Sequence, residues 1–199
     1  ITSGGNGIIT VKGNSGGKGE MSSSNYGVLV GFGGEITAGG SGNISVTGND
    51  KTTASMSTAT SANIGVVVGE NAKIASNGSS VTVTGTGVGI STDNVGVFVA
   101  DGGQITSGGN ITVDATDNDT VEVTGNGTVE VTGNGSTGAT GNGNHGVYIR
   151  GDTSKITTGG NSNVNVKGNS GGKDGMSSNN YGVFIETGGE KKKNGRGVV

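Results

Sequence analysis

The sequence predicts an all-β solenoid, a right-handed parallel β-helix, and three observations lead to this prediction. A unit that opens with isoleucine and a glycine-rich turn, and closes on Asn-x-Gly-Val-x-(Val/Ile), is repeated along the chain. Apolar residues alternate with polar ones in short segments, at matching offsets of successive units. Proline is absent from all 199 residues, which fits strands inside a ladder, where each backbone N–H is needed as a donor.

The repeat predicts a single domain made of about five coils. A unit this short cannot bury a core unless it stacks on its neighbours, so the coils must form one body. The coils start near residues 1, 36, 74, 105 and 156. The domain is expected to cover residues 1–190, and residues 191–199 form a basic tail in which the repeat stops.

Each coil is expected to hold three short strands. The first is an Ile-Thr segment ended by Gly-Gly, the second is an alternating segment such as Ile9–Val11, and the third is Gly-Val-x-Val. Alternation sends Val28 and Val30, and their equivalents in the other coils, inward. Pairing with the next coil then gives three parallel sheets around a filled prism. Parallel connections are overwhelmingly right-handed, and these coils are too long for the hexapeptide type of left-handed prism.

The segment between the second and third strands is the one that varies in length, so it is expected to form exterior arms. The arms cover residues 14–24, 49–62, 86–93, 116–143 and 169–179. The longest contains two tandem copies of Thr-Val-Glu-Val-Thr-Gly-Asn-Gly, at residues 120–127 and 128–135. Their alternation allows extra strand pairs or an additional rung, and a recent duplication explains the copies equally well.

Composition excludes several classes of protein. The 46 glycines resemble a flexible linker, but a linker does not place Val and Ile at matched offsets in successive units. Without cysteine there is no disulfide scaffold, catalytic thiol or thiolate metal site. A net charge of -3 argues against a nucleic-acid partner, which requires a basic stripe. No apolar run reaches the roughly 20 residues of a membrane helix, so membrane insertion of this segment is not expected.

An asparagine opens the closing phrase of every unit. Stacked coils place equivalent side chains about 4.8 Å apart, where one amide can donate to the carbonyl of the next. We expect a structural ladder that secures the turn into the third strand, and a ligand-binding role is the alternative. The ladder residues are Asn25, Asn63, Asn94, Asn144 and Asn180.

The outward position of the third strand carries a large apolar residue in each unit. These residues predict an interaction stripe, because apolar stripes on a solvent face usually mark contacts. Self-association is the first hypothesis, stacking of the aromatic rings on sugars is the second, and burial under an arm is the alternative to exposure. The interaction stripe consists of Leu29, Val67, Phe98, Tyr148 and Phe184.

Catalytic and metal sites are not expected. Polysaccharide-cleaving β-helices need clustered carboxylates, but here the corner acids alternate with lysines and indicate a solvated turn. Those acids are Glu70, Asp101, Asp152 and Glu186, and the lysines are Lys73 and Lys155. The acidic group Asp114, Asp117 and Asp119 lacks a calcium-loop spacing. The lone His145 is expected to be a packed or partly exposed side chain rather than a catalyst, and no cofactor is expected.

Two short motifs carry little weight. Arg150-Gly-Asp152 spells an integrin-type tripeptide, but three-residue matches arise by chance. A flat Thr-x-Thr array for ice binding is interrupted, since only Thr82 and Thr84 form such a pair on the second strands while Lys12 and Lys167 occupy other rungs.

The combination of Asn-x-Gly-Val-(Tyr/Phe)-(Val/Ile), Gly-Gly-x-Ile-Thr and Val-x-Val-x-Gly resembles the passenger repeats of bacterial autotransporter adhesins or similar large secreted repeat proteins. The resemblance covers residues 1–190. It implies a β-helical stalk that promotes attachment and cell-to-cell aggregation, located outside the cell or at its surface.

The expected function is therefore a cell-surface or secreted adhesin, or a structural stalk module, without enzymatic activity. The expected partners are copies of the chain itself and host-surface or matrix glycans. The alternatives are a polysaccharide-binding or polysaccharide-cleaving β-helix protein and an architectural subunit of an extracellular filament.

Overall fold

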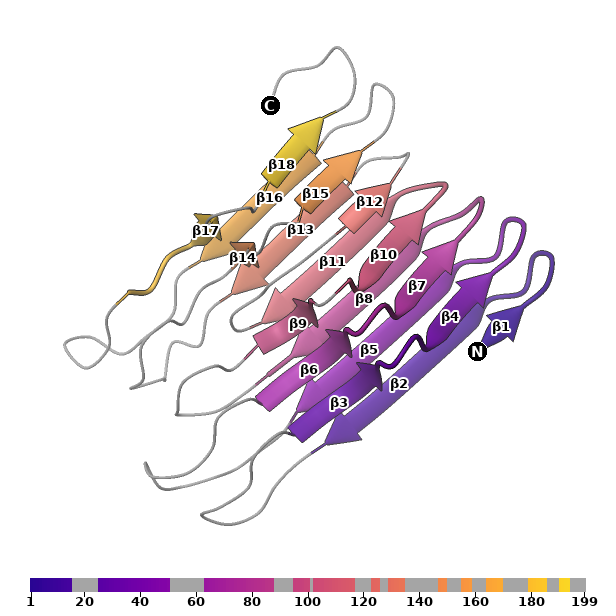
Figure 1. Cartoon of the computed structure of the whole chain (residues 1–199), viewed down its shortest axis with the longest axis horizontal. Coiled ribbons are helices and arrows are strands. Elements are labelled where there is room, and N and C mark those ends of the chain that lie inside the picture. The colour runs from indigo at the N-terminus through magenta and orange to yellow at the C-terminus, as the bar shows by residue number, and fades with distance from the viewer. Residues whose placement is uncertain are drawn as a thin grey trace.

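The chain folds into parallel β-strands that stack along one axis (Figure 1). This computed structural model describes residues 1–15, 25–50, 63–87, 95–100, 102–116, 123–125, 129–134, 147–149, 155–158, 164–169, 179–185 and 190–193. Within these ranges the structure contains strands and no helix. The strands belong to three sheets, called A, B and C here. The prediction of an all-β fold with parallel strands in three sheets is thus confirmed.

Sheet A collects the Ile-Thr segments. Its hydrogen-bonded order is β1-β4-β7-β10-β12-β15-β18. The strands are β1 (Thr2–Ser3), β4 (Glu35–Ala38), β7 (Lys73–Ser76), β10 (Gln104–Ser107), β12 (Val123–Gly125), β15 (Lys155–Thr158) and β18 (Glu190–Lys193).

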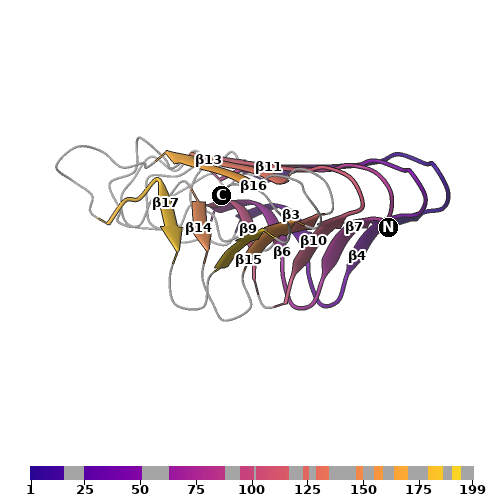
Figure 2. The ribbon, with the colours of Figure 1, turned by 90° about the horizontal axis from the view of Figure 1, so that it is seen from above.

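Sheet B collects the alternating Val-x-Val-x-Gly segments, in the order β2-β5-β8-β11-β13-β16. Figure 2 shows its strands β11, β13 and β16 as one layer, with strands of sheets A and C facing them. The strands are β2 (Ile9–Ser15), β5 (Ile44–Asp50), β8 (Val81–Thr86), β11 (Ile111–Thr116), β13 (Val129–Asn134) and β16 (Val164–Asn169).

Sheet C collects the Gly-Val-x-Val segments and consists of two separate pieces, β3-β6-β9 and β14-β17. The strands are β3 (Asn25–Val30), β6 (Asn63–Val68), β9 (Val95–Val99), β14 (Val147–Ile149) and β17 (Val183–Ile185). Equivalent residues of the repeat pair in register, so Val28, Val66 and Val97 stack on one another in the first piece. In the second piece Val147 pairs with Val183.

The core is built from stacked columns of aliphatic side chains. In sheet A, Ile36, Ile74 and Ile105 are Cα partners and are all buried. Sheets B and C add columns of valine and isoleucine that belong to the same apolar cluster. Alternation along each strand places these side chains inward, as the sequence predicts.

The last strands of sheets B and C leave one inward residue uncovered. Val183 lies against β16, since a Cβ atom placed on Gly168 would be 3.0 Å from Val183 Cγ2. Its side chain is nevertheless 41% exposed, against the expectation of a buried inward column. The reason is that β16 and β17 end their sheets, so Val183 is covered from one side.

Sheets B and C meet through a contact between glycine backbones. A Cβ atom on Gly48 would overlap the carbonyl oxygen of Gly65, and one on Gly85 would overlap that of Gly96. Any side chain at these positions would push the two sheets apart, which explains why glycine recurs there. The backbones of sheets B and C therefore approach each other closely along this edge.

The tandem copies within the longest arm contribute one strand to sheet A and one to sheet B. β12 lies between β10 and β15, and β13 lies between β11 and β16. Among the described residues no strand of sheet C separates β11 from β12, and β9 is not paired with β14. In the part of the chain that the structure describes, sheets A and B therefore have a rung without a matching strand of sheet C.

The segment where the repeat was expected to stop also contributes to sheet A. Strand β18 pairs with β15, with Lys155 opposite Glu190 and Ile156 opposite Lys191. The first residues of the expected tail are therefore hydrogen-bonded to the preceding rung.

Candidate binding pocket

The outer face of sheet C carries the predicted interaction stripe. Leu29, Val67 and Phe98 are consecutive Cα partners in β3, β6 and β9, as the repeat predicts. Leu29 is 53% exposed, whereas Val67 in the middle strand is 8% exposed. The first three residues of the stripe therefore form one column, with its most exposed member on β3.

The other two stripe residues lie in the second piece of sheet C. Tyr148 pairs with Phe184, but β14 is not paired with β9. The five residues therefore do not form one continuous column. The surroundings of the Tyr148 and Phe184 side chains lie outside the described part of the structure.

A second apolar column runs beside the first, and it was not predicted. The ladder between β3 and β6 passes from Tyr26–Ile64 to Val28–Val66 and skips Gly27. This irregularity lets two residues three positions apart, Tyr26 and Leu29, face the same side while Val28 faces the core. The chemical signal was present in Tyr26, Ile64 and Val95, which precede the glycine of the closing phrase, but strict alternation assigns them to the wrong face.

The two columns pack into a small cluster separate from the core. Ile64, Val67 and Val95 are buried in it, and Phe98 packs against them. The inward neighbours of these residues belong to the main cluster, so both faces of sheet C are apolar. A sheet with two apolar faces needs a partner layer on each side.

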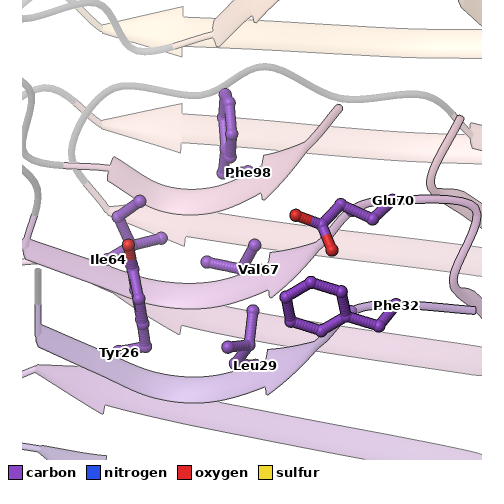
Figure 3. A pocket seen from close by; sticks show the side chains of 9 residues that line it. Tyr26, Leu29, Phe32, Ile64, Val67, Glu70 and Phe98 are labelled. Carbon is purple, nitrogen blue, oxygen red and sulfur yellow. The ribbon is translucent and has the colours of Figure 1, made fainter. Parts of the chain in front are cut away.

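A pocket of about 320 Å³ opens on this face. Figure 3 shows Tyr26 and Ile64 at one end, Phe32 and Glu70 at the other, and Leu29 and Val67 between them. Phe98 closes the side toward β9. The lining residues are Tyr26, Leu29, Gly31, Phe32, Ile64, Val67, Gly69, Glu70 and Phe98.

The Phe32 and Glu70 end of the pocket is set by two stacked turns. Within the first turn, Gly34 N–H donates to Gly31 C=O at 2.9 Å. Gly33 N–H of this turn also donates to Glu70 C=O of the next turn, at 2.9 Å. Phe32 and Glu70 occupy equivalent positions, each with a φ of 54°. This left-handed conformation is costly for residues with a side chain, and for a bulky aromatic residue it is rare.

Glu70 is exposed in a turn, as the sequence suggested, and it also lines the pocket. Its carboxylate reaches back over the strand, with Oε2 4.0 Å from a Cβ atom placed on Gly31, and it lies beside the Phe32 ring (Figure 3). The nearby Lys73 ammonium does not neutralise it, because Lys73 Nζ is 2.9 Å from Glu35 Oε1. This is the one ion pair among the described residues.

The chemistry of the pocket is that of a binding site. Apolar and aromatic side chains form most of its wall, and Glu70 is the only charged lining residue. The described residues contain no group of three or more His, Asp or Glu side chains that could hold a metal ion. The arrangement suits a ligand with an apolar body and a positive or hydrogen-bond-donating end.

Three residues of the predicted asparagine ladder lie among the described residues. The backbones of Asn25 and Asn63 pair in register, and Asn180 is also described. Asn94 and Asn144 lie outside the described residues. A hydrogen bond between two side-chain amides is found at another offset of the repeat, where Asn49 Nδ2 donates to Asn14 Oδ1 at 3.2 Å.

Further amide and hydroxyl contacts hold the corner between sheets A and B. Ser41 Oγ donates to Asn6 Oδ1 at 2.7 Å, and Ser80 N–H donates to Asn43 Oδ1 at 3.2 Å. The buried Ser76 hydroxyl donates to Gly42 C=O at 2.8 Å. These turn residues have a structural role that the repeat pattern alone did not indicate.

Several other sequence-based expectations cannot be placed. His145, Asp117 and Asp119 lie outside the described residues, as do Asp101, Glu186 and the Arg150-Gly-Asp152 motif. Asp114 lies on β11, where its backbone pairs with Thr84 of β8 and Thr132 of β13.

Comparisons with known proteins found no match to this chain. No protein-family model, curated protein or solved structure matches it. The described residues also contain no helix long and apolar enough to cross a membrane.

Proposed function

We propose that this chain is a right-handed parallel β-helix that serves as an adhesive or structural stalk module outside the cell or at its surface, without turning over a substrate. The stacked strands supply a rigid body, and the outer face of sheet C supplies the contact surface. The right hand follows from the strong preference of parallel crossovers. The coil starts near residues 1, 36, 74, 105 and 156 and the resemblance to autotransporter passenger repeats support this assignment.

The observation that carries the proposal is the second apolar face of sheet C. Exposed large apolar residues gather there, with Phe32 86%, Leu29 53% and Tyr26 36% exposed. Contiguous apolar patches on soluble proteins mark contacts with other molecules. A second copy of the chain offers the same face, and a two-fold arrangement would bury the outer face of sheet C in both copies.

The stalk role follows from how the core is made. Each rung adds inward aliphatic residues, each worth about 1.5 to 3 kcal/mol on full burial, together with ladder hydrogen bonds to the next rung. Contacts run only between neighbouring rungs, so length changes by adding or removing coils without altering the cross-section. Such a body holds a binding surface at a set distance from its anchor.

Sedimentation of pocket variants tests self-association. We expect Leu29→Ser combined with Phe32→Ser to shift the monomer–oligomer equilibrium toward monomer, because the largest exposed apolar area is removed. The circular-dichroism spectrum should not change, since neither residue is in the core.

Ile8→Ser is the matched control, because Ile8 is 72% exposed and is not among the pocket residues. It should leave association as in the parent chain. Equal association of the pocket variant and the parent would contradict the proposal.

The aromatic side chains in the pocket favour one alternative, the binding of a polysaccharide. Phe32 and Tyr26 lie at opposite ends of a space of about 320 Å³, where sugar rings can stack against them. Binding to a glycan array without cleavage of the bound glycans would favour this alternative over self-association.

A further inference from the structure

We propose that the Glu70 end of the pocket binds the guanidinium group of an arginine side chain on a partner protein. The arginine stem would lie along the apolar floor, and the guanidinium would contact the Phe32 ring and the Glu70 carboxylate. This inference rests on the proposed contact function of the outer face of sheet C, because the arginine would occupy the same Leu29 and Phe32 surface as a second copy of the chain.

Charge is the first argument. Glu70 is the only charged residue of the lining, and no cation among the described residues pairs with it. Lys73, three residues further along the chain, is engaged with Glu35 at 2.9 Å. A carboxylate placed over an apolar wall gains most from a ligand that brings a positive charge and hydrogen-bond donors.

The backbone of Phe32 is the second argument. This residue is 86% exposed and has a φ of 54°, so it contributes almost nothing to the core while occupying a costly conformation. Gly33 beside it has a φ of 71°, which glycine adopts without penalty. A strained, exposed aromatic residue at the rim of a pocket points to a role in binding.

The choice of arginine follows from the shape of the site. A guanidinium is planar and weakly hydrated, stacks on aromatic faces and pairs with a carboxylate through two parallel N–H donors. Its aliphatic stem covers apolar surface such as that of Leu29 and Val67. A lysine ammonium is a compact, strongly hydrated charge that uses the Phe32 face less well.

Three matched peptides test the proposal by NMR titration of the full chain. The probes are acetylated, amidated pentapeptides Gly-Val-X-Val-Gly in which X is arginine, lysine or citrulline, the uncharged analogue of arginine. We expect the arginine peptide to shift the ring signals of Phe32 and Tyr26. The citrulline peptide should bind about tenfold more weakly, which corresponds to about 1.4 kcal/mol.

Two variants locate the site. Glu70→Gln should reduce arginine-peptide affinity about tenfold, whereas Asp114→Asn, which removes a carboxylate on β11 outside the pocket lining, should leave it unchanged. Phe32→Gly should weaken binding although it relieves the left-handed strain, so a loss of binding cannot be attributed to unfolding.

Three results would overturn the proposal. Equal affinity of the arginine and citrulline peptides would exclude recognition of charge. Equal affinity of the arginine and lysine peptides would exclude a guanidinium-specific site. Unchanged arginine binding in Glu70→Gln would place the contact elsewhere. Sedimentation of the same Glu70→Gln sample reports self-association separately, so failure of this site and failure of the stalk contact remain distinguishable.

Discussion

The two faces of sheet C are built by different rules, although they belong to the same strands. On the inner face, Val28, Val66 and Val97 repeat one residue type from rung to rung. On the outer face, the equivalent stack reads Leu29, Val67 and Phe98. Interior packing tolerates little change of volume, whereas a surface contact depends on the shape of a partner. Uniform columns therefore mark the part that holds the fold, and varied columns mark the part that meets other molecules.

The largest effect is expected where sheets B and C touch, behind the inner face. In Gly48→Ala the new methyl group would overlap the Gly65 carbonyl oxygen, and backbone on both sides cannot yield easily. We expect a loss of about 3 kcal/mol in the free energy of unfolding, measured by urea denaturation.

Gly33→Ala is a useful comparison, because a Cβ atom there meets nothing within 4 Å and only the φ of 71° opposes it. It should cost about 1 kcal/mol. Similar losses for both variants would show that space is not the reason for glycine at residue 48.

The inner and outer faces can be compared directly with two truncations. Val66→Ala removes methyl groups from a side chain that is 0% exposed and should cost about 2.5 kcal/mol. Leu29→Ala removes more carbon, but from a side chain that is 53% exposed, and should cost about 0.5 kcal/mol. Thermal unfolding followed by circular dichroism measures both. A larger loss for Leu29→Ala would mean that the outer face belongs to the core.

The smallest effect has the opposite sign. Phe32→Gly should raise the free energy of unfolding by about 1 kcal/mol, because glycine adopts the φ of 54° without a steric penalty. Chemical denaturation at several protein concentrations would separate this gain from any change in association. A loss of stability would show that the Phe32 ring supports the fold.

Much of the fold could be predicted because residues at the same offset of successive repeats occupy equivalent positions in successive rungs. Ile36, Ile74 and Ile105 share one offset, and residues at one offset are Cα partners in parallel strands. Register therefore follows once one coil is aligned with the next. The additional strands β12 and β13 were open alternatives, because an alternating Val-Glu-Val segment pairs equally well in an arm and in a rung.

The pocket was harder to predict, because it depends on departures from the regular pattern. Strict alternation sends Tyr26 and Leu29 to opposite faces, and only the skipped ladder position at Gly27 brings them together. Phe32 stands in a turn, outside the strand pattern on which the stripe was based. Glu70 was assigned to a solvated turn and is exposed there, but its sequence neighbours did not indicate that its side chain lies beside Phe32, the equivalent residue of the previous turn.

The interruption of sheet C has a consequence for the spacing of surface features. Sheets A and B place β12 and β13 between their neighbours, and each added strand lengthens a sheet by about 4.8 Å. Since β9 and β14 are not paired, the strands β3, β6 and β9 are separated along the stack from β14 and β17. Each tandem copy of eight residues supplies one strand, and the two copies together change the spacing between the two pieces of sheet C without changing the residues of either piece.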